Sequence, residues 1–265
     1  MVVQPLLFAT DLVVLLRADD REVRVLDSVS LALAPGAIAD ITGPSGSGKT
    51  TLLRALARLL PEVTGSLTLD SVPAEQIAPS AWRASVALLP QKPAIFSGSV
   101  AENLRLPWTL KVRHGQTGPT DDALRDALLG VELTDVDLKR DAARLSVGQQ
   151  ARVALLRVLL TNPRVLLLDE PDAALDDASS DAVGARLREF ADAGGAIARV
   201  RHHRSDGLAT ERYLLTGGAL TAIAAGVPEP EFVHGSHGGL APAAPASAAP
   251  APAASAALPP EEVPS

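Results

Sequence analysis

The stretch GPSGSGKT, residues 43–50, decides the fold of this chain. It fits the pattern G-x-x-x-x-G-K-[ST] and lies between a short apolar segment, 37–42, and a segment of helical period, 50–60, that Pro61 ends. Its three glycines allow the backbone to curl, so that successive N–H groups converge on one anion. The start of the following helix directs its positive dipole end to the same point. The sequence therefore predicts a strand, a phosphate-binding loop and a helix, in that order.

The last residues of the loop indicate a nucleotide. We expect Lys49 to reach the β- and γ-phosphates and Thr50 to offer its hydroxyl to Mg²⁺. A glycine-rich turn with a purely structural role would not need this Lys-Thr pair. The residues predicted to bind the nucleotide in this loop are Gly43, Pro44, Ser45, Gly46, Ser47, Gly48, Lys49, Thr50 and Thr51.

A second motif, VLLLDEP at residues 165–171, agrees with this prediction. Its continuous apolar run is typical of a central parallel strand that is buried on both faces. Asp169 ends the run, where a carboxylate can hold the water shell of Mg²⁺ beside the phosphate loop. Glu170 follows, on the opposite side of the pleat or in the turn, where it could polarise a water for attack on the γ-phosphate.

Elsewhere, strand patterns alternate with helical patterns, which predicts an α/β domain with a mixed or parallel sheet over residues 1–226. We expect an N-terminal strand near residues 1–12 and further strands at 23–33, 37–42, 66–69, 85–89, 165–169 and 195–200. Helices are expected at 50–60, 120–129, 147–160 and 178–191. The Ala/Pro-rich segment 227–265 is predicted to be disordered, and its His234 and His237 are too few for a strong metal site.

Bulk composition narrows the function classes. A net charge of -7 argues against nonspecific binding to nucleic acid through a basic face. The chain has no cysteine, which excludes disulfides and thiolate metal sites. No apolar run approaches the roughly 20 residues that cross a bilayer. The N-terminus lacks the basic segment of a signal peptide, so we expect a soluble, intracellular chain.

Six elements follow one another in a characteristic order. They are GPSGSGKTT (43–51), LLPQKP with Gln91, LSVGQQ (145–150), VLLLDEP (165–171), AALD (173–176) and a late histidine, His202. With them the chain resembles the nucleotide-binding subunits of ATP-binding-cassette (ABC) transporters across roughly residues 6–224. The resemblance implies a P-loop ATPase fold with a mixed-sheet core, an antiparallel β subdomain and a helical subdomain at about 90–160.

The same resemblance implies ATP and Mg²⁺ as ligands and a head-to-tail homodimer of these domains. Ser146, Gly148 and Gln149 would bind the nucleotide held by the other subunit, and Asp176 would lie near that interface. The implied catalytic residues are Glu170, His202 and Gln91, and the implied metal ligands are Thr50, Gln91 and Asp169.

Three positions depart from the family pattern. Val147 replaces the first glycine of the usual LSGGQ, but Gly148, whose backbone would meet phosphate, is retained. The switch histidine lacks its usual Thr and Asp neighbours, and His203 is an alternative to His202. The adenine-stacking aromatic residue is missing, and Leu16 or Arg17 is expected to cover the ring.

A narrower resemblance lies in IFSGSVAENL and LPWTLKVR, residues 95–104 and 106–113, which look like the iron-export (Fet) type of cassette. It implies a separately encoded membrane permease, export of iron or another metal, and a place on the cytoplasmic face of the membrane. Trp108 would lie at the docking surface or, alternatively, in the core. The alternative functions are a soluble ABC-type ATPase without a permease and a regulatory nucleotide-binding module.

Overall fold

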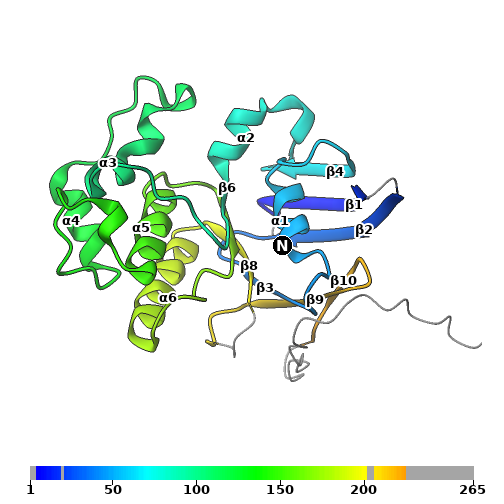
Figure 1. Cartoon of the computed structure of the whole chain (residues 1–265). Helices are drawn as coiled ribbons and strands as arrows, with labels where there is room; N and C mark the ends of the chain where they lie inside the picture. The colour runs from blue at the N-terminus through cyan, green and yellow to red at the C-terminus, as the bar shows by residue number, and fades with distance from the viewer. Residues whose placement is uncertain (1–3, 19–20, 202–205, 225–265) are drawn as a thin grey trace, which may run out of the picture. The chain divides into compact units, whose positions relative to one another are not determined.

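A computed structural model describes residues 4–18, 21–201 and 206–224 of the chain (Figure 1). Two sheets organise this part of the protein. The first is antiparallel, with strand order β2-β1-β4-β5. Its strands are β1 (Leu7–Ala18), β2 (Arg21–Leu33), β4 (Val63–Leu69) and β5 (Val72–Pro73).

The second sheet has six strands in the order β10-β9-β3-β8-β7-β6. All neighbouring pairs are parallel except β10 and β9, so the sheet is mixed, as predicted. Its strands are β3 (Ile38–Thr42), β6 (Val86–Leu89), β7 (Val165–Asp169), β8 (Ala196–Val200), β9 (Glu211–Thr216) and β10 (Ala219–Ala222).

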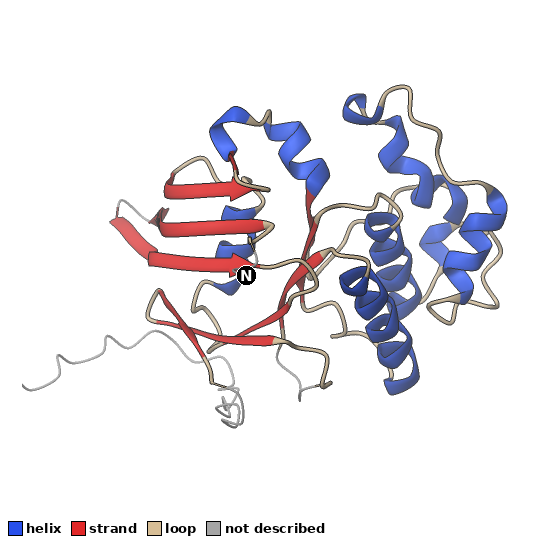
Figure 2. Ribbon diagram, turned by 180° about the vertical axis from the view of Figure 1, so that it is seen from behind, coloured by secondary structure: helices blue, strands red, loops and turns tan. Residues whose placement is uncertain are grey.

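The helices cover the two faces of the six-stranded sheet. One face packs on α1 (Lys49–Leu56), which lies between this sheet and the antiparallel one (Figure 1). Figure 2 shows the helices that cover the other face gathered on one side. These are α3 (Val100–Arg105), α4 (Asp121–Leu129), α5 (Val147–Leu159) and α6 (Asp177–Asp192). A further helix, α2 (Pro79–Ser85), precedes β6, and short 3₁₀ turns lie at Ala74–Gln76, Leu106–Thr109, Lys111–Arg113 and Ala142–Arg144.

Strand β7 contributes to both apolar cores. Val165 and Leu167 belong to the cluster shared with α1 and the antiparallel sheet. Leu166 and Leu168 belong to the cluster shared with the four helices of the other face. Because side chains alternate across a strand, a strand covered on both faces is mostly apolar, which explains the run Val165–Leu168 in the sequence.

The helix after the phosphate-binding loop ends earlier than predicted, at Leu56 instead of Leu60. Arg58 takes the left-handed conformation, with φ of +53°, and the Leu59 amide donates back to the Arg54 carbonyl at 2.9 Å. This is the hydrogen-bond pattern of a Schellman motif, which closes a helix. The Arg58 guanidinium donates to the carbonyl of Ile77 and lies 5.6 Å from the centre of the Trp82 ring. These contacts, made by distant residues, fix a conformation that arginine seldom adopts.

Other boundaries also differ: the first strand, predicted near residues 1–12, is β1 at Leu7–Ala18. Ser85 was predicted to begin a strand, but it ends α2, a helix that the sequence patterns did not predict. Three predictions concern residues outside the described part of the chain. They are the switch role of His202, its alternative His203, and the character of the segment 227–265. None of the described helices is both long enough and apolar enough to cross a bilayer.

Candidate functional site

The phosphate-binding loop joins β3 to α1 at the carboxyl end of the six-stranded sheet. Gly43, Gly46 and Gly48 have φ angles of +149°, +78° and +102°, a region that favours glycine. A Cβ on Gly43 would lie 2.1 Å from the Leu215 carbonyl oxygen in β9, so only glycine fits there. The backbone geometry that the sequence motif predicted is therefore present.

Lys49, the first residue of α1, reaches back across this loop. Its Nζ donates to the carbonyls of Gly43 at 2.8 Å and Pro44 at 2.9 Å, and the residue is buried. Burial lowers the pKa of Lys49, while the charges of Glu170 and Asp169 oppose that shift. A bound anion would favour the ammonium form in the same way. The buried hydroxyl of Ser47, in the same loop, has no hydrogen-bond partner among the described residues. Both observations fit a loop that receives phosphate.

Thr50 and Asp169 meet beside the loop, although they are distant in sequence. The Thr50 hydroxyl donates to Asp169 Oδ2 at 2.8 Å, and Asp169 is buried at the end of β7. Burial raises the pKa of Asp169, and the hydrogen bond from Thr50 opposes the shift. A hydroxyl and a carboxylate are the hard oxygen donors that Mg²⁺ prefers. The described residues contain no group of three or more His, Cys, Asp and Glu side chains that could hold a metal ion.

Glu170 lies in the turn after β7, with φ of +51°, which decides between the two positions predicted for it. Its amide donates to the Val200 carbonyl at 3.1 Å. Gln91, two residues after β6, donates from its side-chain amide to Glu170 Oε2 at 2.8 Å. Since Glu170 follows Asp169, the structure brings the predicted residues Gln91, Glu170, Asp169 and Thr50 to one edge of the sheet.

The stretch LSVGQQ forms the start of α5. Ser146 caps the helix: its hydroxyl accepts from the Gln149 amide at 3.2 Å, and its own amide donates to the Gln149 side chain at 3.1 Å. Gly148 approaches the loop after β7 so closely that a Cβ would lie 2.9 Å from the Ala174 carbonyl oxygen. Val147 is 73% exposed and fits a helix-start position without a clash. Among the described residues, no hydrogen bond or ion pair joins residues 146–149 to 43–51.

Two predictions concern residues outside the phosphate loop: the cover of the adenine ring by Leu16 or Arg17, and the place of Trp108 at a docking surface or in the core. Leu16 in β1 pairs with Val23 in β2, and both side chains are exposed. The Arg17 guanidinium lies 3.8 Å from Glu22 at the same end of the hairpin. Trp108 is half-buried, and the guanidinium carbon of Arg113 lies 5.6 Å from the centre of its ring. Its side chain is therefore neither fully buried in the core nor fully exposed.

The sequence patterns missed a set of buried charges next to the site. Asp40 in β3 and Arg199 in β8 are each 2% exposed and pair within the sheet. They occupy the same register position on neighbouring strands. One opposite charge in each of two apolar strands was a signal, but it becomes readable only when the strand order is known.

A strand–loop–helix phosphate site at the edge of a mixed sheet, with an acidic strand end beside it, defines a P-loop nucleotide-binding domain. The family model described as ABC transporter matches residues 26–173. The chain belongs to the ABC transporter family and carries the ATP-binding ATPase domain of that family. The predicted fold class and family are therefore confirmed.

Named relatives agree with this assignment. The chain is 42% identical to Protein STAR1 of Oryza sativa subsp. japonica over 164 residues, which are 62% of this chain but only 46% of that protein. It is 32% identical to the probable iron export ATP-binding protein FetA of Escherichia coli (strain K12) over 169 residues, 64% of this chain and 73% of that protein. A solved dimeric ATP-binding cassette in a post-hydrolysis state, bound to ADP and Pi, has a TM-score of 0.70 at 22% identity, over 81% of this chain and 96% of that one.

Proposed function

We propose that this chain is the ATP-hydrolysing subunit of an ABC exporter whose permease is a separate chain. The proposal of ATP hydrolysis rests on one observation: four side chains lie together beside the phosphate-binding loop, namely those of Thr50, Asp169, Glu170 and Gln91. The loop would hold the phosphates through its backbone amides and Lys49. A bound Mg²⁺ would neutralise charge on the phosphates, with Thr50, Asp169 and Gln91 as the residues that hold it or its water shell.

Glu170 is the proposed base. A carboxylate next to the phosphate loop can orient a water and accept its proton during attack on the γ-phosphate. The amide of Gln91, 2.8 Å from this carboxylate, would hold Glu170 in place before nucleotide arrives and exchange that contact for the metal or the water afterwards. His202 remains the proposed switch residue, with His203 as its alternative.

A head-to-tail dimer would complete the nucleotide site. Ser146 and Val147 at the start of α5 are exposed, and among the described residues no hydrogen bond or ion pair joins them to the chain's own phosphate loop, which supports the use of this helix N-terminus on a second copy. The dimeric cassette with the same fold supports this arrangement. Ser146, Gly148 and Gln149 would then bind the γ-phosphate held by the partner, while the capping box keeps the helix start rigid.

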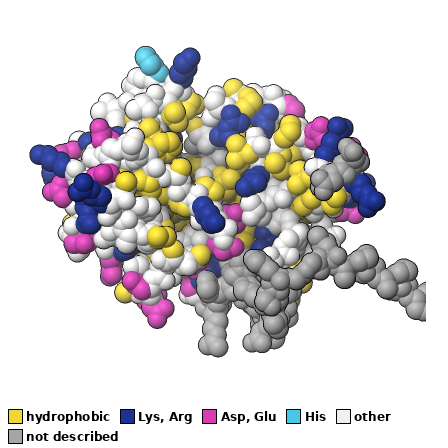
Figure 3. Space-filling model, viewed as in Figure 1, with side chains coloured by type: hydrophobic (Ala, Val, Ile, Leu, Met, Phe, Trp, Pro, Cys, Tyr) yellow, Lys and Arg dark blue, Asp and Glu magenta, His cyan; other side chains and the backbone are white. Residues whose placement is uncertain are grey.

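A groove between α2 and the turns after α3 is the proposed docking surface for the permease. It has a volume of about 420 Å³, and its lining includes Ala84, Pro107, Leu110 and Val112 with Arg113. Figure 3 shows hydrophobic side chains gathered on this face of the molecule. Leu110 is 54% exposed, which suits burial by an apolar partner segment.

We propose export, with iron or another metal as substrate, because FetA is among the relatives; the chain would then lie on the cytoplasmic face of the membrane.

The first test is ATP-dependent dimerisation of the Glu170→Gln protein, measured by light scattering with Mg²⁺ present. We expect a dimer with ATP, because the substitution keeps the shape of the side chain but removes the base, so that the nucleotide persists. Ser146→Arg in the same background is the control and should abolish the dimer by placing a bulky cation at the start of α5. A Glu170→Gln protein that binds ATP yet stays monomeric would contradict the proposed dimer.

A further inference from the structure

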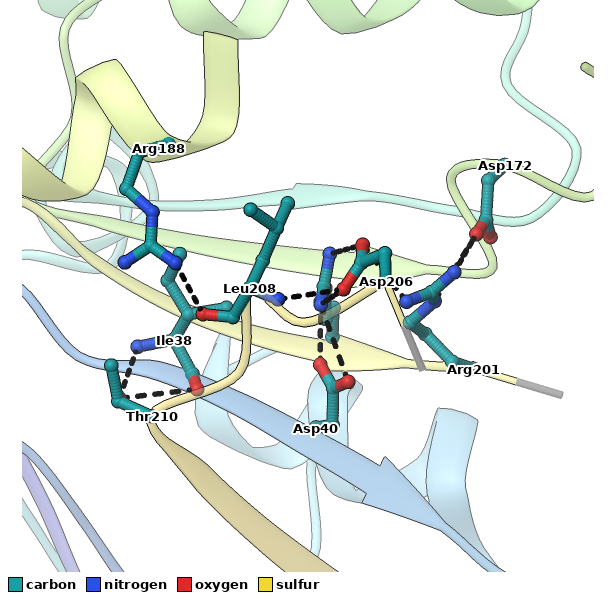
Figure 4. Close-up of polar contacts among 9 residues, drawn as sticks. Ile38, Asp40, Asp172, Arg188, Arg201, Asp206, Leu208 and Thr210 are labelled. Carbon is teal, nitrogen blue, oxygen red and sulfur yellow. Dashed lines mark hydrogen bonds and ion pairs between the residues drawn. The ribbon is translucent and has the colours of Figure 1, made fainter. Parts of the chain in front are cut away.

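Five charged side chains form a continuous network behind the catalytic turn (Figure 4). It starts at Asp40 in β3 and continues through Arg199 in β8. Arg201, the residue after β8, pairs with Asp172 in the turn after β7, and Asp206 joins the two arginines. Arg199 is 2% and Arg201 5% exposed. The network therefore connects β3 and β8 with the turn that follows β7.

The hydrogen bonds of the network leave its arginines little freedom. Arg199 donates to Asp40 at 2.5 and 3.2 Å and to both carboxylate oxygens of Asp206 at 2.7 and 2.8 Å. Asp206 also lies 2.8 Å from Nη1 of Arg201. Arg201 in turn donates from Nε and Nη2 to Asp172 Oδ2 at 3.1 and 2.6 Å. Arg201 therefore forms an ion pair with Asp206, in which its Nη1 makes no hydrogen bond among the described residues, and hydrogen bonds with Asp172.

Burial raises the pKa of Asp40, and the hydrogen bonds from Arg199 oppose that shift. Burial also acts to raise the pKa of Asp206, but the hydrogen bonds from Arg199 and from the Leu208 amide outweigh it and leave the pKa lowered. Burial thus acts against the charged form of Asp40, whereas the hydrogen bonds of Asp206 favour its charged form.

Asp172 belongs to the same turn as Glu170. The Glu170 carbonyl accepts from the Ala173 amide at 3.3 Å, and the Glu170 amide donates to Val200, the residue before Arg201. The turn is consequently attached to the end of β8 at two adjacent points, by its backbone at Val200 and by the Asp172 side chain at Arg201. Two attachments fix the direction of a turn, whereas one would allow it to rotate.

Stability alone explains this network poorly. Desolvation of buried ions offsets most of their mutual attraction, and matched apolar side chains often stabilise a core as well. Within the described residues, Asp172 Oδ1 is buried and accepts no hydrogen bond. The network gives the turn a defined geometry, which apolar side chains in its place would not. An arginine that donates twice to one carboxylate restricts the orientation of both side chains.

We propose that Arg201 and Asp172 are positioning residues for Glu170: their ion pair, held by Asp206, fixes the turn that carries Glu170 against β8. This rests on the proposed function, in which Glu170 is the base of ATP hydrolysis. Displacement of a catalytic group by about 1 Å can reduce a rate by roughly 100-fold without affecting binding contacts elsewhere. The pair therefore acts on turnover and not on ATP affinity.

The test compares Asp172→Ala, Asp172→Asn and Arg201→Met in the full chain, with kcat and KM for ATP, equilibrium ATP binding and urea unfolding as readouts. We expect kcat to fall roughly tenfold or more in Asp172→Ala and Arg201→Met, with ATP affinity within about twofold of wild type. Asp172→Asn, which can still accept a hydrogen bond from Arg201, should keep more activity and guards against a variant that fails to fold.

Arg164→Met is the matched control, because Arg164 makes an exposed pair with Asp70 at 2.8 Å next to the opposite end of β7. It should change neither kcat nor ATP affinity. If Asp172→Ala acts through Glu170, adding it to Glu170→Gln should cause no further loss of turnover, because residues that act as a unit are not additive.

Three results separate the proposals. If Glu170→Gln abolishes turnover while Asp172→Ala and Arg201→Met retain wild-type kcat, the positioning role is wrong and the proposed function stands. Equal losses of kcat and ATP affinity in these variants would likewise overturn the positioning role in favour of a binding or folding role. If Glu170→Gln retains turnover, the proposed base is wrong and the positioning role falls with it.

Discussion

Replacing Arg199 with Leu should destabilise the protein strongly, whereas replacing its partner as well should restore most of the loss. Among the described residues, Arg199 supplies both hydrogen bonds that the Asp40 side chain accepts, at a site where Asp40 is 2% exposed. Removing one partner of a buried ion pair leaves an uncompensated charge and costs about 3–5 kcal/mol. In Asp40→Leu/Arg199→Leu the two leucines would face each other in register across β3 and β8, as an apolar core pair can.

Urea unfolding monitored by circular dichroism measures this difference. With a denaturant dependence of about 3 kcal/mol per molar, the Arg199→Leu midpoint should fall by roughly 1 to 2 M. Asp206 keeps its contact with Arg201 in both variants, so it does not distinguish them. A double variant no more stable than Arg199→Leu would refute the reasoning, because the cost would then lie in the lost guanidinium packing and not in the unpaired carboxylate.

Two further predictions concern the phosphate loop. Gly43→Ala would place a Cβ 2.1 Å from the Leu215 carbonyl oxygen and should yield little folded protein, whereas Gly46→Ala meets nothing within 4 Å and should cost only about 1–2 kcal/mol of left-handed strain. Equal urea midpoints for the two variants would show that the close approach does not decide the glycine. Burial lowers the pKa of Lys49 below its ordinary 10.5, and bound phosphate favours its charged form. ATP affinity should therefore fall as the pH is raised towards 10.5. Calorimetric titration of Lys49→Arg, which stays charged, should give a flatter profile, and an equally steep one would exclude Lys49 as the titrating group.

Contiguous motifs predicted the centre of the site well. Residues 43–50 specify a loop between a strand and a helix by local backbone requirements, and the structure has that loop. The run 165–169 predicted β7 to the residue, because a strand buried on both faces favours a continuous apolar run. The meeting of Thr50 with Asp169 was also predicted, since loops that follow parallel strands share one edge of the sheet.

Non-local contacts decided what the patterns missed. Arg58 ends α1 four residues earlier than predicted because side-chain and carbonyl partners from residues 74–82 hold it in a left-handed conformation. The position of Glu170 in the turn was left open by the sequence and is fixed by its hydrogen bond to Val200.

The sequence by itself determined the family, the order of the central elements and the residues of the nucleotide loop, because each depends on neighbouring residues and on strand or helix periodicity. Only the tertiary structure decided how the charges behind the site pair. Asp40 and Arg199 are 159 residues apart, and nothing local marks them as partners. Their pairing depends on β8 lying beside β3 in one particular register, and a shift by a single residue would turn one of the two side chains to the opposite face of the sheet.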